Sequence, residues 1–494
     1  MSLARGACPT LFQPMQTGDG LLARLNPVGG ALNGRQLAGL AQAAKRFGNG
    51  IIEITARGSL QIRGLTEEST GGLAAEVESL GIAVRSGLPI DTNPLAGRDS
   101  EEVADPRDLA REIAERAAAL GLSERLGPKV SVTVDGGGAL GLGGITADVK
   151  LEGMAQSFAD TVEVDSSRSG GVPPSPTRFA GHLSPASGGE EGRAGIAAGD
   201  SSPPLWGRGA ERMRGGEGVT RHKNIRSNEN ETVRGSGGGN TGHCASNITW
   251  VIRVGGTSAT ARVLGHFSQD NAVETTVRIL RAIAERGLNA RARDLSESDL
   301  AAITGRGSSP TAARTEPTRP PVGRYALCDG KQAQGVALAY GQIESEALAG
   351  FAQSIGEIRL APGRGLIVLD VAGGEETALL AAAERAGLVT EPADPRLAIA
   401  TCAGSPACAS AHLATKRLAD RLVARRPDLA RQSPVHISGC EKQCARPSGP
   451  VISLLGSGEG YRIVNDGADP APDLKALLVE LAEEERASTQ GQHS

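Results

Sequence analysis

Four of the seven cysteines lie close together near the C-terminal end of the sequence. Cys402 and Cys408 are separated by five residues, Cys440 and Cys444 by three, and 31 residues lie between the two pairs. Four thiolates brought together from two loops form a soft-metal site, and four sulfurs are the usual ligands of a cubane iron–sulfur cluster. Structural zinc sites favour tighter spacings in both pairs. The pattern therefore favours a [4Fe–4S] cluster over a zinc ion and over four unrelated buried thiols.

The residues around the cysteines predict the elements that position them. Ser405 followed by Pro406 is typical of a helix start, and an apolar periodicity continues to residue 426. This predicts a helix whose first turn contains Cys408, where unpaired amides stabilise negative charge. Apolar runs flank the second cysteine pair and predict strands at 435–437 and 451–455.

The chain contains an internal repeat. Residues 20–65 follow the pattern strand, helix, strand, strand, and residues 335–371 follow the same pattern. The helices of the two units contain the similar segments QLAGLAQ at 36–42 and ALAGFAQ at 347–353. A further helix follows each unit. Two similar αβ units in one chain indicate a duplication and predict a pseudo-twofold architecture.

A segment between the repeats differs from the rest of the chain. Residues from about 155 to 247 are rich in Gly, Ser, Pro and Arg and have no sustained apolar period. Such a segment buries too little apolar surface to offset its ordering entropy, which predicts a disordered insertion between two paired strands. The predicted domains are a first ferredoxin-like half at 1–88, an α/β domain at 89–304, a linker at 305–323, a second half at 324–395, a cluster domain at 396–486 and a disordered tail at 487–494.

Composition limits the classes of partner and the compartment. The formal net charge is −4 and no basic stripe is present, which predicts no nucleic-acid binding. The sequence has no run of 18 apolar residues and no long apolar region at its N-terminus, so we expect neither a membrane span nor a signal peptide. Unpaired cysteines and an iron–sulfur site suit a reducing compartment, which predicts a cytoplasmic protein.

The cysteine pattern, the duplicated unit and the segments TARGSLQ at 55–61 and PKVSVTVDGGG at 128–138 resemble the nitrite/sulfite reductase superfamily. The resemblance covers nearly the whole chain outside the predicted insertion. It implies an α+β fold in which duplicated ferredoxin-like αβ units form a pseudo-twofold domain and two flanking α/β domains grip a tetrapyrrole. Within the superfamily, RGACP at 5–9, DGLLARL at 19–25 and NPLAGRD at 93–99 are most similar to the precorrin-3B synthase branch.

That resemblance implies an oxidoreductase of aerobic cobalamin biosynthesis, a monooxygenase that hydroxylates the tetrapyrrole precorrin-3A at C20 with formation of a lactone. It implies a [4Fe–4S] cluster, O2 and NADH or another reductant as co-substrates, and an electron-donor reductase as a partner. A further non-haem iron is expected, because a cluster alone is an electron carrier. The alternatives are a sirohaem-dependent assimilatory sulfite or nitrite reductase and a non-catalytic electron-transfer protein.

The same resemblance suggests residues for the tetrapyrrole carboxylates, although it assigns no catalytic residue. Arg57 and Gln61 match the arginine and glutamine of the superfamily segment Thr-x-Arg-x-x-x-Gln, and Lys129 matches the first lysine of its Lys-x-Lys pair. Arg24, Arg63 and Arg253 are candidates by position. Guanidinium groups suit this ligand because they can pair with carboxylates in a bidentate manner.

The sequence departs from the reductase pattern at two places. Ser131 stands where the reductases have the second lysine, and the loop Asp91-Thr92-Asn93 has no ligand-facing arginine. Six-electron reduction of sulfite needs cationic groups that hold the anion and deliver protons. The loss of two such groups favours hydroxylation of a bound macrocycle.

Overall fold

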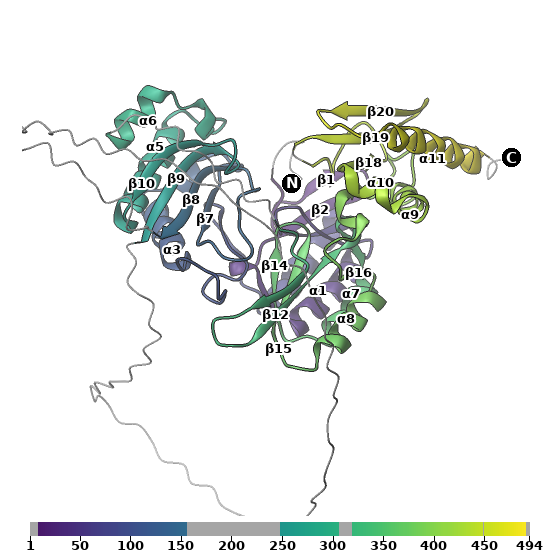
Figure 1. Ribbon diagram of the computed structural model, residues 1–494, viewed down its shortest axis with the longest axis horizontal. Coiled ribbons are helices and arrows are strands. Elements are labelled where there is room, and N and C mark those ends of the chain that lie inside the picture. Colours follow the sequence, from purple (N-terminus) through teal and green to yellow (C-terminus); the bar gives the residue numbers. More distant parts are fainter. Residues whose placement is uncertain (1–7, 156–247, 306–318, 448, 491–494) are drawn as a thin grey trace, which may run out of the picture. The chain divides into compact units, whose positions relative to one another are not determined.

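The computed structural model describes residues 8–155, 248–305 and 319–490, except residue 448 (Figure 1). The described residues belong to one compact unit. The predicted insertion lies outside them apart from Ala155, and so does most of the predicted linker at 305–323.

The predicted repeat is confirmed. The first unit begins with a β-hairpin, and its helices start at Asn33 and Thr66, whose side chains accept hydrogen bonds from the helix N-terminal amides. Its elements are β1 (Met15–Thr17), β2 (Gly20–Leu25), α1 (Gly34–Phe47), β4 (Ile51–Ile54), β5 (Leu60–Leu65) and α2 (Glu67–Ser79). The second unit consists of β11 (Gly323–Ala326), β12 (Gln332–Leu338), α7 (Ser345–Ala352), β14 (Glu357–Ala361), β15 (Gly365–Val371), α8 (Glu376–Arg385) and β16 (Leu388–Val389).

The two units exchange strands. The short β3 (Ala31–Asn33) of the first unit pairs with β14 of the second, and β13 (Gln342–Glu344) of the second pairs with β4 of the first. One continuous apolar core therefore contains residues of both units, such as Leu37 of α1 and Phe351 of α7. The exchange makes the two repeats a single pseudo-twofold domain.

The predicted α/β domain contains a five-stranded sheet in the order β10-β9-β8-β7-β6. Its strands are β6 (Ile90–Thr92), β7 (Val132–Asp135), β8 (Ala147–Ala155), β9 (Ile248–Gly256) and β10 (Arg262–Phe267). The helices are α3 (Arg107–Ala119), α4 (Leu122–Arg125), α5 (Gln269–Glu285) and α6 (Glu297–Thr304), and α3 and α5 pack on the apolar face of the sheet. β8 and β9 pair up to Ala155 and Ile248, so the insertion joins two paired strands, as predicted.

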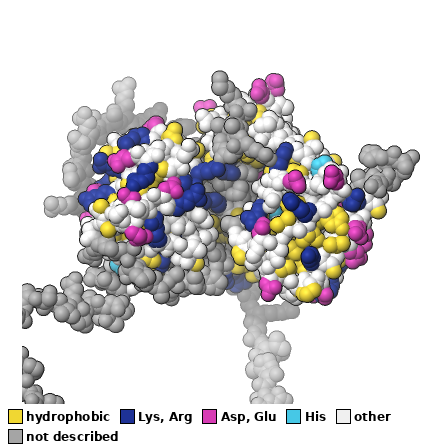
Figure 2. Space-filling model, turned by 90° about the horizontal axis from the view of Figure 1, so that it is seen from above, with side chains coloured by type: hydrophobic (Ala, Val, Ile, Leu, Met, Phe, Trp, Pro, Cys, Tyr) yellow, Lys and Arg dark blue, Asp and Glu magenta, His cyan; other side chains and the backbone are white. Residues whose placement is uncertain are grey.

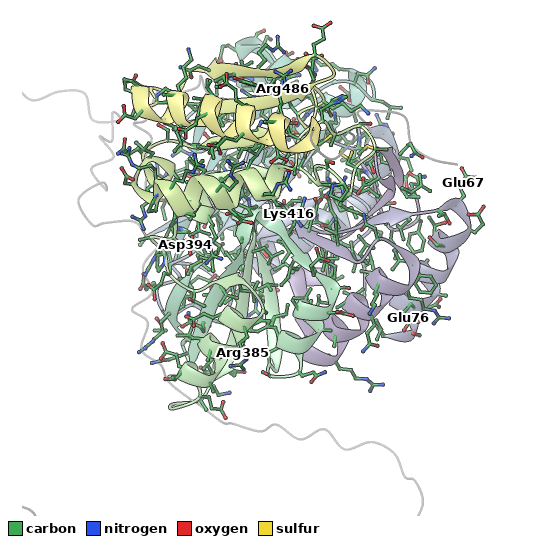
Figure 3. The ribbon with its side chains drawn as sticks, turned by 90° about the vertical axis from the view of Figure 1, so that its right-hand side faces the viewer. Glu67, Glu76, Arg385, Asp394, Lys416 and Arg486 are labelled. Carbon is green, nitrogen blue, oxygen red and sulfur yellow. The ribbon has the colours of Figure 1, made fainter. Side chains whose placement is uncertain are left out.

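The C-terminal domain has a four-stranded sheet in the order β17-β18-β19-β20. Its elements are β17 (Ile399–Thr401), α9 (Thr415–Arg425), α10 (Pro427–Gln432), β18 (Val435–Ser438), β19 (Val451–Ser457), β20 (Gly460–Asp466) and α11 (Pro472–Gln490). α11 thus continues beyond the predicted start of the tail at 487. Figure 3 shows Lys416 on α9, and its Nζ lies 4.0 Å from Glu344 of the second repeat.

The visible surface carries charges of both signs. Figure 2 shows Lys and Arg side chains interspersed with Asp and Glu side chains over one face. No helix in the described part of the chain is long and apolar enough to cross a membrane.

Candidate metal centre and cationic cavity

The two cysteine pairs follow the ends of adjacent parallel strands. β17 ends at Thr401, directly before Cys402, and β18 ends at Ser438, two residues before Cys440. Because the carboxyl ends of parallel strands meet at one edge of a sheet, both loops leave the sheet side by side. The Gly439 amide donates a hydrogen bond to Cys402 Sγ at 3.2 Å.

The helix predicted to contain Cys408 in its first turn does not form there, so that prediction is wrong. The chain from 403 to 414 is a loop that folds back on itself, with the Ser405 amide donating to the Leu413 carbonyl at 2.9 Å. α9 begins only at Thr415, whose hydroxyl donates to the Cys402 carbonyl at 2.8 Å. The Cys408 amide donates to the Gly404 carbonyl at 2.8 Å, so one turn forms before Cys408, but the chain then folds back instead of continuing as a helix.

The cysteine thiols lie close enough to act on one another electrostatically. Burial raises the pKa of Cys402, and the neighbouring Cys440 and Cys408 raise it further. Desolvation by the surrounding protein raises the pKa of Cys444, and the other three thiols add to the shift. The raised pKa values favour the neutral thiols of Cys402 and Cys444, and a bound cation would favour the thiolates by compensating their mutual repulsion.

Among the residues that the structure describes, no group of three or more His, Cys, Asp or Glu side chains, the four cysteines included, converges closely enough to hold a metal ion. The four cysteines remain predicted cluster ligands.

A hairpin of the first repeat lies against the loop that contains Cys408. The Gly18 carbonyl, in the turn between β1 and β2, accepts a hydrogen bond from the Ala409 amide at 3.0 Å. A Cβ atom on Gly18 would lie 2.3 Å from Cys408 Sγ. A segment about 390 residues earlier in the chain thus packs against the cysteine loop, and no local sequence pattern predicts this contact.

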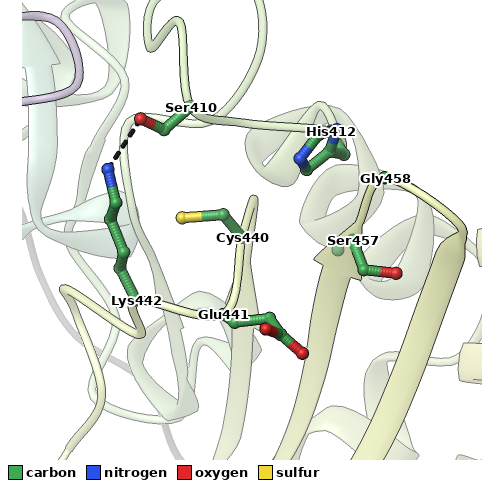
Figure 4. A pocket seen from close by; sticks show the side chains of 8 residues that line it. Ser410, His412, Cys440, Glu441, Lys442, Ser457 and Gly458 are labelled. Carbon is green, nitrogen blue, oxygen red and sulfur yellow. Dashed lines mark hydrogen bonds between the residues drawn. The ribbon is translucent and has the colours of Figure 1, made fainter.

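A polar cavity of about 510 Å³ gives access to Cys440 from the outside (Figure 4). Across it, Lys442 Nζ donates to Ser410 Oγ at 2.8 Å. The cavity is lined by Ser410, His412, Cys440, Glu441, Lys442, Gly456, Ser457 and Gly458.

Three of the predicted tetrapyrrole-binding residues, Arg24, Gln61 and Arg63, lie on β2 and β5, and Gln61 and Arg63 are buried. With its amide oriented to satisfy its neighbours, Gln61 accepts hydrogen bonds from Arg24 at 2.7 and 2.9 Å and donates to Glu53 at 2.9 Å. Burial lowers the pKa of Arg24. Arg63 donates one hydrogen bond from each of its three guanidinium nitrogens to Asp19 or Glu53, so three of its five N–H groups already serve these carboxylates.

Arg57 projects from the turn between β4 and β5 into the α/β domain. Its Nη1 donates to the Thr146 carbonyl at 2.7 Å, and its Nη2 lies 3.3 Å from Asp91 Oδ2 and 3.4 Å from Ser131 Oγ. The side chain remains 43% exposed. Lys129, in contrast, is exposed in the turn before β7 and does not line the cavity that contains Arg57.

That cavity, of about 410 Å³, is formed by the first repeat, α3, the loops before β6 and β8, and Leu360 and Pro362 of the second repeat. Arg85, which the sequence reasoning missed, lines it and donates to Asp91 Oδ1 at 2.6 Å. Asp91 therefore bridges Arg57 and Arg85. The loop Asp91-Thr92-Asn93 has no arginine of its own, but Arg85, six residues before Asp91, places a guanidinium in the cavity.

A polar row crosses the sheet behind Arg57. Its members are register partners on the four adjacent strands β6, β7, β8 and β9, namely Asp91, Thr133, Lys150 and Arg253. Lys150, another residue that the sequence reasoning missed, is 1% exposed, and its ammonium donates to the carbonyls of Leu142 and Ile145 at 3.0 Å. Burial lowers the pKa of Lys150 to about 8. Lys150 thereby holds the loop between β7 and β8 in place. This loop contains Thr146, whose carbonyl accepts the hydrogen bond from Arg57.

Comparisons with known proteins agree with this architecture. Residues 13–80 match the family described as nitrite/sulfite reductase ferredoxin-like half domain. The chain is 35% identical over 475 residues to precorrin-3B synthase of Sinorhizobium sp., covering 94% of this chain and 84% of that protein. It is 34% identical over 136 residues to ferredoxin–nitrite reductase of Synechococcus elongatus, 26% of each chain.

A solved structure resembles the fold over most of the chain. The Mycobacterium tuberculosis NirA protein superposes with a TM-score of 0.59 at 18% identity, covering 91% of this chain and 76% of NirA. At this identity the likeness concerns the fold alone. The predicted α+β fold of the sulfite and nitrite reductases is thereby confirmed.

Proposed function

Because the chain belongs to the precorrin-3B synthase family, within the nitrite/sulfite reductase superfamily, we propose that it hydroxylates precorrin-3A at C20, with lactone formation by an acetate side chain. One atom of O2 enters the macrocycle and the other leaves as water. The reaction therefore consumes two electrons and two protons, which NADH or another reductant supplies through an electron-donor reductase. A reducing cytoplasm is the compartment that suits this chemistry.

The observation that carries the proposal is the pair of groups around Arg57. Asp91 Oδ2 lies 3.3 Å from its guanidinium, and Ser131 stands at the place of a reductase lysine. A reductase needs additional cationic groups that hold a small anion such as sulfite or nitrite, and Ser131 does not supply one. The missing lysine therefore supports oxidation of a macrocycle over reduction of an anion at a sirohaem.

We assign Cys402, Cys408, Cys440 and Cys444 as ligands of a [4Fe–4S] cluster. When bound, such a cluster supplies electrons one at a time. The residues around it hold its loops in place through the Gly439 amide and the Thr415 hydroxyl, which fix Cys402. The predicted additional non-haem iron has no single-ion site among the described residues.

The cavity beside Arg57 is the proposed place for a carboxylate arm of the tetrapyrrole. Arg57 is half exposed, and it shares Asp91 with Arg85, so the two guanidinium groups together have more donors than one carboxylate can occupy. A substrate carboxylate can take the remaining donors in charge-assisted hydrogen bonds. Gln61, Arg24 and Lys129 remain predicted substrate residues.

The reaction is tested with purified protein, precorrin-3A, reductant and isotopically heavy dioxygen. The expected product is heavier than the substrate by one labelled oxygen atom, and the visible spectrum should show a broad cluster absorption without haem bands. Strong Soret and α bands, together with sulfite or nitrite reduction, would instead establish the sirohaem reductase.

The cluster assignment is tested by Cys440→Ala, with Cys328→Ala as the matched control. Cys328 is an exposed cysteine outside both cysteine pairs. Cys440→Ala should lose the broad absorption and most iron and sulfide, whereas Cys328→Ala should keep both. Unchanged iron and sulfide in Cys440→Ala would refute the ligand set.

A further inference from the structure

A buried ion network lies beneath the hairpin that touches Cys408. Arg63 pairs with Asp19 through two hydrogen bonds of 2.7 Å and reaches Glu53 at 3.1 Å. The Arg63 side chain is 8% exposed and that of Asp19 is 1% exposed. Burial raises the pKa of Asp19, but the hydrogen bonds and positive charge of Arg63 outweigh this effect and hold the pKa below its usual range. Arg63 and Asp19 are therefore both charged at neutral pH.

This network is attached to the rest of the first repeat on several sides. Thr17 donates to Asp19 at 2.7 Å and Asn49 at 3.3 Å, which fixes the β1–β2 turn over Arg63. Glu53 also accepts from Gln342 of the second repeat at 2.6 Å. The position of Arg63 is thus determined by both repeats.

The network also reaches the cysteines. Asp19 directly follows Gly18, whose carbonyl accepts the Ala409 amide and whose Cα faces Cys408 Sγ. Arg63 binds Asp19 through two hydrogen bonds of 2.7 Å. The buried guanidinium therefore lies against the residue that follows the glycine facing Cys408 Sγ, one of the proposed cluster ligands.

We propose that Arg63, held by Asp19 and Glu53, is a positioning residue that sets the redox potential of the four-cysteine cluster rather than a ligand of the tetrapyrrole. The inference rests on the proposed cluster and deepens it. A reduced cluster carries one more negative charge than an oxidised one, so a nearby cation favours reduction and a nearby anion opposes it. Arg63 and Asp19 should therefore act in opposite directions.

The opposite signs give a sharp test. The full-length chain is reconstituted with iron and sulfide under anaerobic conditions, and the midpoint potential is measured by titration with spin-resonance detection. Arg63→Gln should lower the reduced-to-oxidised ratio at a fixed potential about tenfold, which corresponds to about 59 mV for one electron. Asp19→Asn keeps the size of the side chain but leaves Arg63 with one carboxylate fewer, and it should raise the ratio.

Two further variants separate charge from stability. Arg63→Lys keeps the positive charge and loses the bidentate geometry. The midpoint potential of the cluster in this variant should therefore lie much closer to that of the unchanged chain than the potential in Arg63→Gln does. Asp148→Asn is the matched control, because Asp148 is a buried aspartate that Arg291 binds in a similar bidentate manner in the α/β domain. It should leave the potential unchanged.

The outcomes distinguish this inference from the proposed function. Shifts in the same direction for Arg63→Gln and Asp19→Asn, or shifts below twofold in both, would overturn the role of Arg63 while the cluster stands. If Arg63→Gln does not fold, the sign of the shift in Asp19→Asn decides alone. An unchanged chain that incorporates no iron and sulfide would overturn the cluster assignment itself.

Discussion

Arg57 and Arg364 occupy equivalent turns of the two repeats, and each donates a hydrogen bond to a backbone carbonyl of a different flanking domain. Arg57 Nη1 lies 2.7 Å from the Thr146 carbonyl, and Arg364 Nη1 lies 2.6 Å from the Ile399 carbonyl. The turns also touch, because the Gly363 amide donates to the Ala56 carbonyl at 2.9 Å. The duplication thus provides one arginine for each flanking domain, and the two have diverged in burial.

Arg364→Ala should destabilise the protein more than Arg57→Ala. Burial lowers the pKa of Arg364 to about 10, and its removal leaves the buried Ile399 carbonyl without this donor. We expect a loss of about 1–3 kcal/mol in the free energy of unfolding, against at most about 1 kcal/mol for the half-exposed Arg57. Urea titrations of both variants measure this, and equal losses would contradict the expectation.

Arg57→Ala should weaken the binding of precorrin-3A. The loss of a charge-assisted hydrogen bond to a carboxylate costs about 1.5–3 kcal/mol, which is at least tenfold in affinity. Absorbance titration of the protein with precorrin-3A measures the change. Arg278→Ala, an exposed arginine on α5, is the control and should bind as before; an affinity equal to that of the control would exclude the role of Arg57.

Gly18→Ala should reduce the amount of cluster without unfolding the chain. A Cβ there would meet Cys408 Sγ at 2.3 Å, so the hairpin or the cysteine loop must shift. We expect fewer iron and sulfide atoms per chain and faster loss of the broad absorption in air. Gly71→Ala, in open space on α2, is the control and should retain the cluster. Full iron content in Gly18→Ala would show that the contact is dispensable.

Lys150→Met should remove part of the pH dependence of stability. The pKa of Lys150 is about 8 in the folded protein, below about 10.4 in an unfolded chain. Between these values the unfolded state binds more protons, so this residue makes stability rise with pH, by an amount on the order of 3 kcal/mol. Below pH 8 this contribution is absent.

Thermal unfolding at several values of pH measures the effect as the difference between the two proteins. The gain from pH 8 to 10 should be smaller in Lys150→Met than in the unchanged chain. Lys129→Met, which removes an exposed lysine, should behave like the unchanged chain. Parallel pH profiles for Lys150→Met and the unchanged chain would show that Lys150 keeps an ordinary pKa.

Replacement of residues 156–247 by a short Asn-Gly turn should preserve the fold. Ala155 and Ile248 are already register partners at the ends of β8 and β9. Each halving of a loop reduces the closure entropy by about 0.6 kcal/mol, so the shortened chain should unfold at the same or a higher temperature. A lower unfolding temperature would indicate that the replaced residues contribute to the packed domain.

Much of the architecture could be predicted from local patterns. Apolar periodicity located both repeats and the strands that flank the cysteines, because it reports which side of each element is buried. It failed for the loop of Cys408, where Ser405 and Pro406 imitate a helix start. There the pairing of the Ser405 amide with Leu413 decides the conformation, and such a contact has no local signature.

The sequence by itself determined the chemistry that is available: four thiolates in two pairs, duplicated αβ units and a set of arginines. Only the tertiary structure decided how these are used. It exchanged β3 and β13 between the repeats, placed Asp91 between Arg57 and Arg85, and paired Arg63 with Asp19. The physical reason is that residue type fixes charge and ligand character, whereas the partner of a buried charge depends on which distant segments pack together.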